Sequence, residues 1–120
     1  MTAGVTNVTV IEGQPDDANL PASACDAVFM RNVYHHFANP AAMDATLIRA
    51  LKGGGRIAVI DFAAGNGESP EPAGRAKEPH HGVSSASVIR ELGGAGFTDL
   101  SSQSGPGRFE FMVVGARPRE

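Results

Sequence analysis

Two apolar segments of strand length, residues 26–32 and 56–62, enclose a helical segment, and this order constrains the fold more than any other feature. Both segments are continuously apolar, which is typical of strands in a parallel sheet that helices cover on both faces. A strand, a helix and a strand of these lengths form a right-handed βαβ unit. The chain is therefore predicted to have an α/β fold.

The helix inside this unit carries its own start and stop signals. Asn39 suits the N-cap, and Pro40 suits the first helical position. Three glycines predict the end of the helix and the turn into the next strand. One helical face carries the apolar side chains at i, i+4 and i+8: Met43, Leu47 and Leu51.

Less regular segments flank the βαβ unit. A short β-branched run at 8–12 predicts one more strand before it. Residues 63–82 are rich in Gly, Pro and Glu and have no apolar period, so they are predicted to form a long mobile loop. A second amphipathic helix is expected to follow, with Ser84 or Ser85 as its cap.

The C-terminal region predicts an antiparallel hairpin. Residues 98–102 and 109–116 are the candidate strands, and the Ser-Gly-Pro-Gly run at 104–107 supplies the turn. The chain has 120 residues, of which 42% are hydrophobic, so one small domain with its own core is expected over residues 1–120.

Composition argues against several classes of function. The net charge is −3 and the basic residues are scattered, which argues against a nucleic-acid interface. Cys25 is the only cysteine, so neither an intrachain disulfide nor a thiolate metal cluster is expected, and we predict no metal site. The sequence has no signal-peptide pattern and no membrane-length apolar run, so we expect a cytoplasmic protein without membrane contact.

The chain resembles class I S-adenosylmethionine-dependent methyltransferases in two segments. The first is similar to the family's fourth strand, following helix and fifth strand and reads LPASACDAVFMRNVYHHFANPAAMDATLIRALKGGGRIAVIDF. The second is similar to the family's late helix and reads HHGVSSASVIRELGGAGF. The Tyr-His-His-Phe run points to a type 11-like branch. The resemblance implies a partial Rossmann-like methyltransferase sheet, equivalent to strands three to seven of the family, that ends in the antiparallel hairpin.

Two departures from the family pattern bear on activity. Gly53 stands where the family usually has the proline of a Lys-Pro-Gly-Gly turn, and glycine tolerates that conformation. The family's acid-x-G-x-G-x-G loop, whose backbone approaches the cofactor closely, occurs nowhere in these 120 residues. We therefore expect a truncated domain that is inactive by itself.

The resemblance also implies where S-adenosylmethionine would lie. Gly13 and Gln14 stand where the family usually has Gly-Asp, and the amide oxygen of Gln14 would accept the bond from the adenine amino group. A plain polar turn is the alternative for this pair, and the acids at 16–17 are the alternative ligands. Asn32 and Val33 end the strand at 26–32 and are expected to line the methionine end of the cofactor.

The candidate catalytic residues are Tyr34, His35 and Asp61. A histidine of the run at 34–37 can act as a general base or orient a substrate hydroxyl. One histidine of the pair is expected to pack under the helix, and His35 is the expected pocket-facing member. Asp61, at the end of the strand at 56–62, has two open interpretations: a residue on the substrate side of the pocket, or a turn residue that holds the following loop.

The resulting functional expectation is a methyltransferase-like protein whose complete form acts on a small molecule. The alternative is a non-catalytic half-domain that self-associates or completes another chain. Without the family's first strand, the strand at 26–32 would be an unprotected edge. We expect a homodimer through this edge or by exchange of the N-terminal strand, with an apolar interface around Val28, Met30 and Val8.

Overall fold

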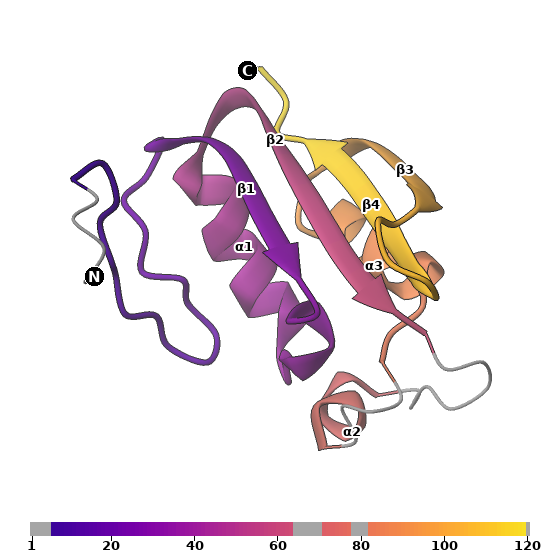
Figure 1. The fold of residues 1–120 in the computed structure, drawn as a ribbon. Coiled ribbons are helices and arrows are strands. Elements are labelled where there is room, and N and C mark those ends of the chain that lie inside the picture. The colour runs from indigo at the N-terminus through magenta and orange to yellow at the C-terminus, as the bar shows by residue number, and fades with distance from the viewer. Residues whose placement is uncertain (1–5, 64–70, 78–81, 120) are drawn as a thin grey trace.

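A computed structural model describes residues 6–63, 71–77 and 82–119, and it has one mixed sheet with helices packed behind it (Figure 1). The elements in chain order are β1 (Cys25–Arg31), the 3-10 helix η1 (Tyr34–His36), α1 (Pro40–Ala50), β2 (Leu51–Phe62), α2 (Pro72–Lys77), α3 (Ser85–Gly94), β3 (Thr98–Ser104) and β4 (Glu110–Ala116).

The sheet has the strand order β1-β2-β4-β3. β1 and β2 are parallel neighbours joined through α1, so the predicted βαβ unit is confirmed. β4 is antiparallel to both β2 and β3, which confirms the C-terminal hairpin. The fold is the predicted partial α/β sheet, with β2 and β4 as its two inner strands.

Helix α1 begins as predicted but ends earlier. The side chain of Asn39 accepts a hydrogen bond from the Ala42 N–H at 3.3 Å. The helix ends at Ala50, because the guanidinium of Arg117 donates to the carbonyls of Ile48, at 3.0 Å, and Leu51. This cap comes from the far end of the chain, so the helix sequence alone did not reveal it.

The core lies between the sheet and the two longer helices. The Ser84 hydroxyl caps α3 by accepting from the Ser87 N–H at 3.1 Å, and the predicted amphipathic helix is confirmed. α1 and α3 lie behind the same face of the sheet (Figure 1). Side chains from both helices and from β2 and β4 form the buried cluster, among them Met43, Leu47, Ile57, Val59, Leu92 and Val113.

The opposite face of the sheet is open in the described part of the chain. Phe29, Ala58 and Val114 lie side by side in the strand register, and Phe29 is 65% exposed. A shallow hollow of about 350 Å³ lies over these residues. The prediction of helices on both faces is therefore wrong for the described residues, because α1 and α3 both connect their strands on the same side.

The strand predicted at 8–12 is absent from the structure. These residues have no strand partner, and Val10 is 74% exposed. The segment runs outside β1 and is attached further on, where the Ala18 N–H donates to the Thr46 hydroxyl at 3.1 Å (Figure 1). β-branched residues favour a strand only where a neighbouring backbone completes the ladder, and no described segment supplies one here.

The segment predicted as a long loop contains helix α2. Its two ends meet, because Ala63 and Gly82 form an isolated antiparallel bridge and the Val83 N–H donates to the Phe62 carbonyl at 2.9 Å. Residues 64–70 and 78–81 lie outside the described residues, so the mobility of the segment stays a prediction. None of the helices in the described ranges is long and apolar enough to cross a membrane.

The cap on α1 leads to a stability prediction. Arg117→Ala removes a donor that the last carbonyls of α1 share, so we expect the free energy of unfolding to fall by about 1–3 kcal/mol in urea denaturation. Arg90→Ala is the control: its side chain is largely exposed and its contact with Glu91 is 4.0 Å long. We expect a change within about 0.5 kcal/mol for that variant. Equal losses in both variants would show that the cap contributes nothing of its own.

Candidate active site at the carboxyl ends of the parallel strands

The carboxyl ends of β1 and β2 meet at one edge of the sheet. The Asn32 N–H donates to the Ile60 carbonyl at 2.8 Å, directly after β1 ends. Asn32 itself has a left-handed backbone with φ of 57°, which turns the chain from the strand into η1. In open α/β sheets, ligands bind outside such strand ends. This edge is therefore the candidate site.

His35 and Asp61 form a buried pair at this edge. The ring Nδ1 of His35 lies 2.8 Å from Oδ1 of Asp61, and the His35 backbone N–H donates to Oδ2 at 3.0 Å. His35 is 3% exposed and Asp61 is 0% exposed. Because an ionised carboxylate has no hydrogen to donate, the contact requires the hydrogen on Nδ1. The ring is then oriented with Nε2 as its proton acceptor.

Asp61 also holds its own strand end. Its Oδ1 accepts a hydrogen bond from the Phe62 N–H at 2.8 Å. Asp61 thus makes three contacts: with the His35 ring, with the His35 N–H and with the Phe62 N–H. The same contacts fit both interpretations of Asp61, a residue of the site and a turn residue that holds the following loop. The ring of Phe62 packs edge-on against His35 at 5.1 Å between centroids. The histidine is fixed both by hydrogen bonds and by packing.

The two histidines differ in their burial. His35 is the buried member, while His36 is exposed and stacks on it at 4.2 Å between ring centroids. The expectation that one histidine of the pair packs inside is met by His35, and its role as the pocket-facing member stays a prediction. Within η1 the His35 ring is held inward because Asp61 satisfies both its backbone and its ring N–H.

Tyr34 belongs to a second buried group. Its hydroxyl donates to Oδ2 of Asp44 at 2.6 Å, and both residues are fully buried. Burial raises the pKa of Asp44 to about 7 and raises the pKa of the Tyr34 phenol well above its usual range. Nearby, Arg75 of α2 donates two hydrogen bonds to Glu91 of α3, each 3.0 Å long. We call Tyr34, Asp44, Arg75 and Glu91 the buried polar cluster.

The sequence analysis missed three members of this cluster. Asp44 lies within the apolar stripe of α1, between Met43 and Leu47, and an acid in such a stripe was a usable signal. Glu91 interrupts the stripe of α3 in the same way. No sequence signal pointed to Arg75, because its burial depends on α2 packing against η1.

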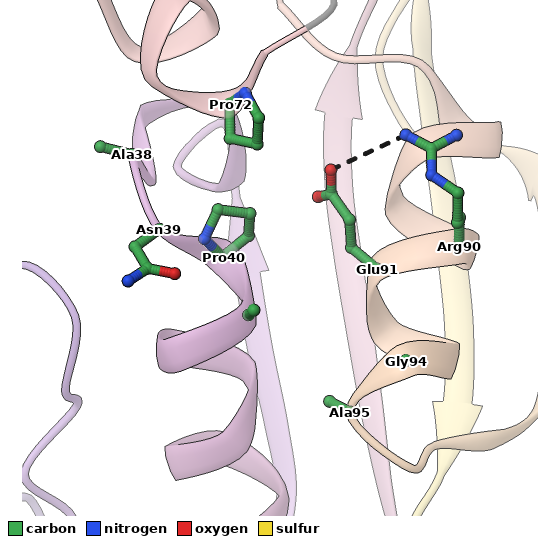
Figure 2. A pocket seen from close by; sticks show the side chains of 9 residues that line it. Ala38, Asn39, Pro40, Pro72, Arg90, Glu91, Gly94 and Ala95 are labelled. Atoms are coloured by element: carbon green, nitrogen blue, oxygen red, sulfur yellow. Dashed lines mark ion pairs between the residues drawn. The ribbon is translucent and has the colours of Figure 1, made fainter.

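A pocket of about 340 Å³ lies on the helix side of the molecule (Figure 2). Pro40 at the start of α1 faces Glu91 and Arg90 of α3 across it, and Pro72 of α2 lies at one end. None of the residues predicted from the sequence as catalytic or cofactor-binding lines this pocket.

The predicted cofactor residues fall into two groups. Asn32 and Val33 lie at the carboxyl end of β1, and Val33 is 42% exposed. Gly13 and Gln14 lie in the N-terminal segment, where the Gln14 N–H donates to the Asp17 carbonyl at 2.7 Å. No contact among the described residues joins the two groups. The structure therefore brings together His35, Asp61 and the end of β1. It has Gln14 in a turn closed with Asp17, and the cofactor role of Gly13 and Gln14 stays a prediction.

Metal ligation has no support in the described ranges. No group of three or more His, Cys, Asp or Glu side chains there is arranged to hold an ion.

The raised pKa of Asp44 predicts how stability depends on pH. The folded protein keeps a proton up to about pH 7, whereas the unfolded chain releases it near the ordinary value of 3.8. The folded state thus binds more protons between these values, and the free energy of unfolding should fall as pH rises through this window. Asp44→Asn keeps an acceptor for Tyr34 and cannot ionise, so it should reduce this fall in urea denaturation between about pH 5 and pH 8.

Asp99→Asn serves as the control for this measurement, since Asp99 is exposed in β3. It should keep the pH dependence of the unchanged protein. An unchanged pH dependence in Asp44→Asn would contradict the assignment of the titration to Asp44.

Comparison with known proteins agrees with this fold. The sequence profile of the family described as "Methyltransferase domain" matches residues 2–59. A comparison with curated proteins found no match. Many solved structures are similar, and a SAM-dependent methyltransferase from Aquifex aeolicus is 24% identical with a TM-score of 0.73 over 94% of this chain.

Two further solved structures show the same fold at lower identity. Human N-acetylserotonin methyltransferase in complex with SAM is 18% identical over 90% of this chain, with a TM-score of 0.64. Phosphoethanolamine N-methyltransferase 2 of Haemonchus contortus is 10% identical over 88%, with a TM-score of 0.65.

The chain spans only part of these proteins: 56% of the Aquifex chain, 33% of the human chain and 36% of the Haemonchus chain. The profile match over residues 2–59 and the shared fold make the chain similar to part of a methyltransferase domain.

Proposed function

We propose that this chain forms the proton-accepting side of an S-adenosylmethionine-dependent methyl transfer to a small molecule, with His35 as general base and Asp61 as its positioning partner. The observation that carries the proposal is the 2.8 Å contact between His35 and Asp61 at the carboxyl ends of the parallel strands. A buried carboxylate behind a histidine orients the ring and stabilises the imidazolium that forms when Nε2 takes a proton.

The reaction needs little more from side chains. The sulfonium methyl group of S-adenosylmethionine is a strong electrophile, so alignment of the donor and the nucleophile supplies much of the rate. An acceptor hydroxyl or amine must also lose a proton, and the proposal assigns that step to His35, whose burial requires the site to open or to be completed before an acceptor reaches Nε2. In this proposal Tyr34 is a positioning residue, because its hydroxyl is engaged with Asp44 and it precedes His35 in η1.

Cofactor binding, in this proposal, requires a further polypeptide segment. Asn32 and Val33 offer the methionine end of a site, whereas the glycine-rich loop of the family is missing from the sequence. The resemblance places the strand that leads into this loop beside β1, whose outer edge has no partner in the described residues. A segment with strand, G-x-G-x-G loop and helix would therefore complete both the sheet and the cofactor site.

Calorimetry with S-adenosylhomocysteine tests this requirement. We expect no binding to the chain alone, and binding after addition of a polypeptide that carries the strand, glycine-rich loop and helix of a methyltransferase. Tight binding by the chain alone would overturn the requirement, and no binding in either case would overturn the cofactor proposal. Asn32→Ala should weaken the restored binding. Asn19→Ala is the matched control, because Asn19 also has a left-handed backbone but lies in the N-terminal segment.

The role of His35 is tested in the completed enzyme. With small phenols and amines as acceptors, His35→Gln should lower the rate of S-adenosylhomocysteine formation by about 10²–10⁴-fold. Affinity for S-adenosylhomocysteine should stay unchanged, which separates catalysis from misfolding. His36→Gln is the matched control, since His36 is exposed and makes no described contact with Asp61. Similar losses in the two variants would contradict a general-base role for His35.

A different observation favours a second function, self-association without catalysis. In the described residues one face of the sheet is open and Phe29 on it is 65% exposed, as is typical of surfaces that bind a partner.

A further inference from the structure

The pocket between α1 and α3 has no role in the proposed methyl transfer. Its volume of about 340 Å³ lies at the lower end of the range in which small-molecule sites fall, roughly 300–1,000 Å³. Its walls come from the start of α1, the first residue of α2 and the last turns of α3 (Figure 2). All of these walls belong to the described part of the chain.

The backbone of α3 does not require the glycine at position 94. Gly94 is the last residue of the helix, and its φ is not positive. The left-handed turn that ends the helix falls instead on Gly96, with φ of 110°. A Cβ atom at Gly94 would meet no described atom within 4 Å. Glycine weakens a helix, so what this residue contributes here is a pocket wall without a side chain.

The rest of the lining is small and mostly apolar. Ala38, Pro40, Pro72 and Ala95 have no polar group in their side chains. Such short side chains leave room for a ring, and they offer its body no hydrogen bond. The lining therefore favours a ligand with an apolar body about one ring in size.

The two charged residues of the lining differ in how far they are neutralised. Both carboxylate oxygens of Glu91 accept hydrogen bonds from Arg75, each 3.0 Å long. Arg90 lies 4.0 Å from Oε2 of Glu91 and 3.5 Å from the Ser87 hydroxyl, and its side chain is 69% exposed. Because Arg75 already balances Glu91, the positive charge of Arg90 is left over. A guanidinium forms its strongest hydrogen bonds with a carboxylate or a phosphate.

We propose that this pocket binds a small apolar carboxylate, with its body against Pro40, Gly94 and Ala95 and its carboxylate paired with Arg90. An amine would be repelled by Arg90 and would find Glu91 already bonded. A neutral alcohol would leave the guanidinium without an anionic partner. The inference uses neither S-adenosylmethionine nor the edge of the sheet that carries His35, so it and the proposed methyl transfer can fail independently.

Amide NMR of the full chain during titration with cyclohexanecarboxylate tests the site. We expect saturable shifts with a dissociation constant of about 1 mM or below, as is usual for a ligand of this size. The signals of Ala41, Gly94 and Ala95 should move, because these residues line the pocket. Those of Phe29 and Phe109, which are exposed elsewhere, should stay. Shifts centred on either phenylalanine, or no saturable shift, would overturn the proposal.

Two further ligands and a pair of variants test the charge. Cyclohexylmethanol and cyclohexylmethylamine keep the body but replace the carboxylate by a neutral or a positive group, and both should bind about threefold or more weakly. Arg90→Gln should bind cyclohexanecarboxylate no better than the unchanged protein binds the alcohol. Arg108→Gln is the matched control, because Arg108 is exposed in the hairpin turn. Equal binding of all ligands, or equal effects of the two variants, would overturn the assignment of a carboxylate.

Filling the pocket tests the location. Gly94→Phe adds a ring to the pocket wall and should raise the dissociation constant by about tenfold or more. Gly93→Phe is the matched control: a Cβ there points to Leu100, 3.5 Å away, and Gly93 does not line the pocket. The thermal unfolding midpoint of Gly94→Phe should not fall, because a helical glycine is replaced at a position with open space. Loss of folding would show that this space is not free, and binding that survives would show that the ligand lies elsewhere. Either result would overturn the proposal.

Discussion

The carboxylate of Asp61 accepts hydrogen bonds from the ring of His35, from the backbone of His35 and from the backbone of Phe62, and the geometry of the carboxyl edge depends on these contacts. They tie the end of β2 to the 3-10 helix that follows β1. Because a buried carboxylate is costly unless its oxygens are satisfied, the surrounding chain has little freedom to move away from it. The same carboxylate orients the one histidine that the proposed reaction uses.

The helix side of the sheet is organised by a second set of buried polar groups. The buried polar cluster joins η1, α1, α2 and α3 around the Tyr34 hydroxyl and the Arg75–Glu91 pair. Since Tyr34 and His35 are neighbours in η1, the cluster and the Asp61 carboxylate hold the same short helix from two directions. Oδ1 of Asp44 has no hydrogen-bond partner among the described residues, which agrees with a carboxyl that keeps its proton near neutral pH.

The end of β1 and the open face of the sheet lie outside the helix layer. In the proposed function the end of β1 offers Asn32 and Val33 to a cofactor. On the open face the ring of Phe29 is 65% exposed beside Ala58 and Val114. The described helices cover the other face of the sheet, so these side chains stay accessible in the described part of the chain.

The sequence by itself determined the elements whose signals are local. The Asn39–Pro40 start of α1, the Ser84 cap of α3 and the hairpin turn before β4 all depend on residues close in the chain. It also named His35 and Asp61, although 26 residues separate them. Only the tertiary structure decided that they touch and that Arg117 ends α1. It also decided that, among the described residues, the run at 8–12 finds no partner and one face of the sheet stays open. These four outcomes have one physical reason. A strand ladder, a buried pair, a covered sheet face and a helix cap donated by Arg117 each need a second segment that is distant in the sequence. A local sequence pattern does not tell whether that segment lies nearby in the fold.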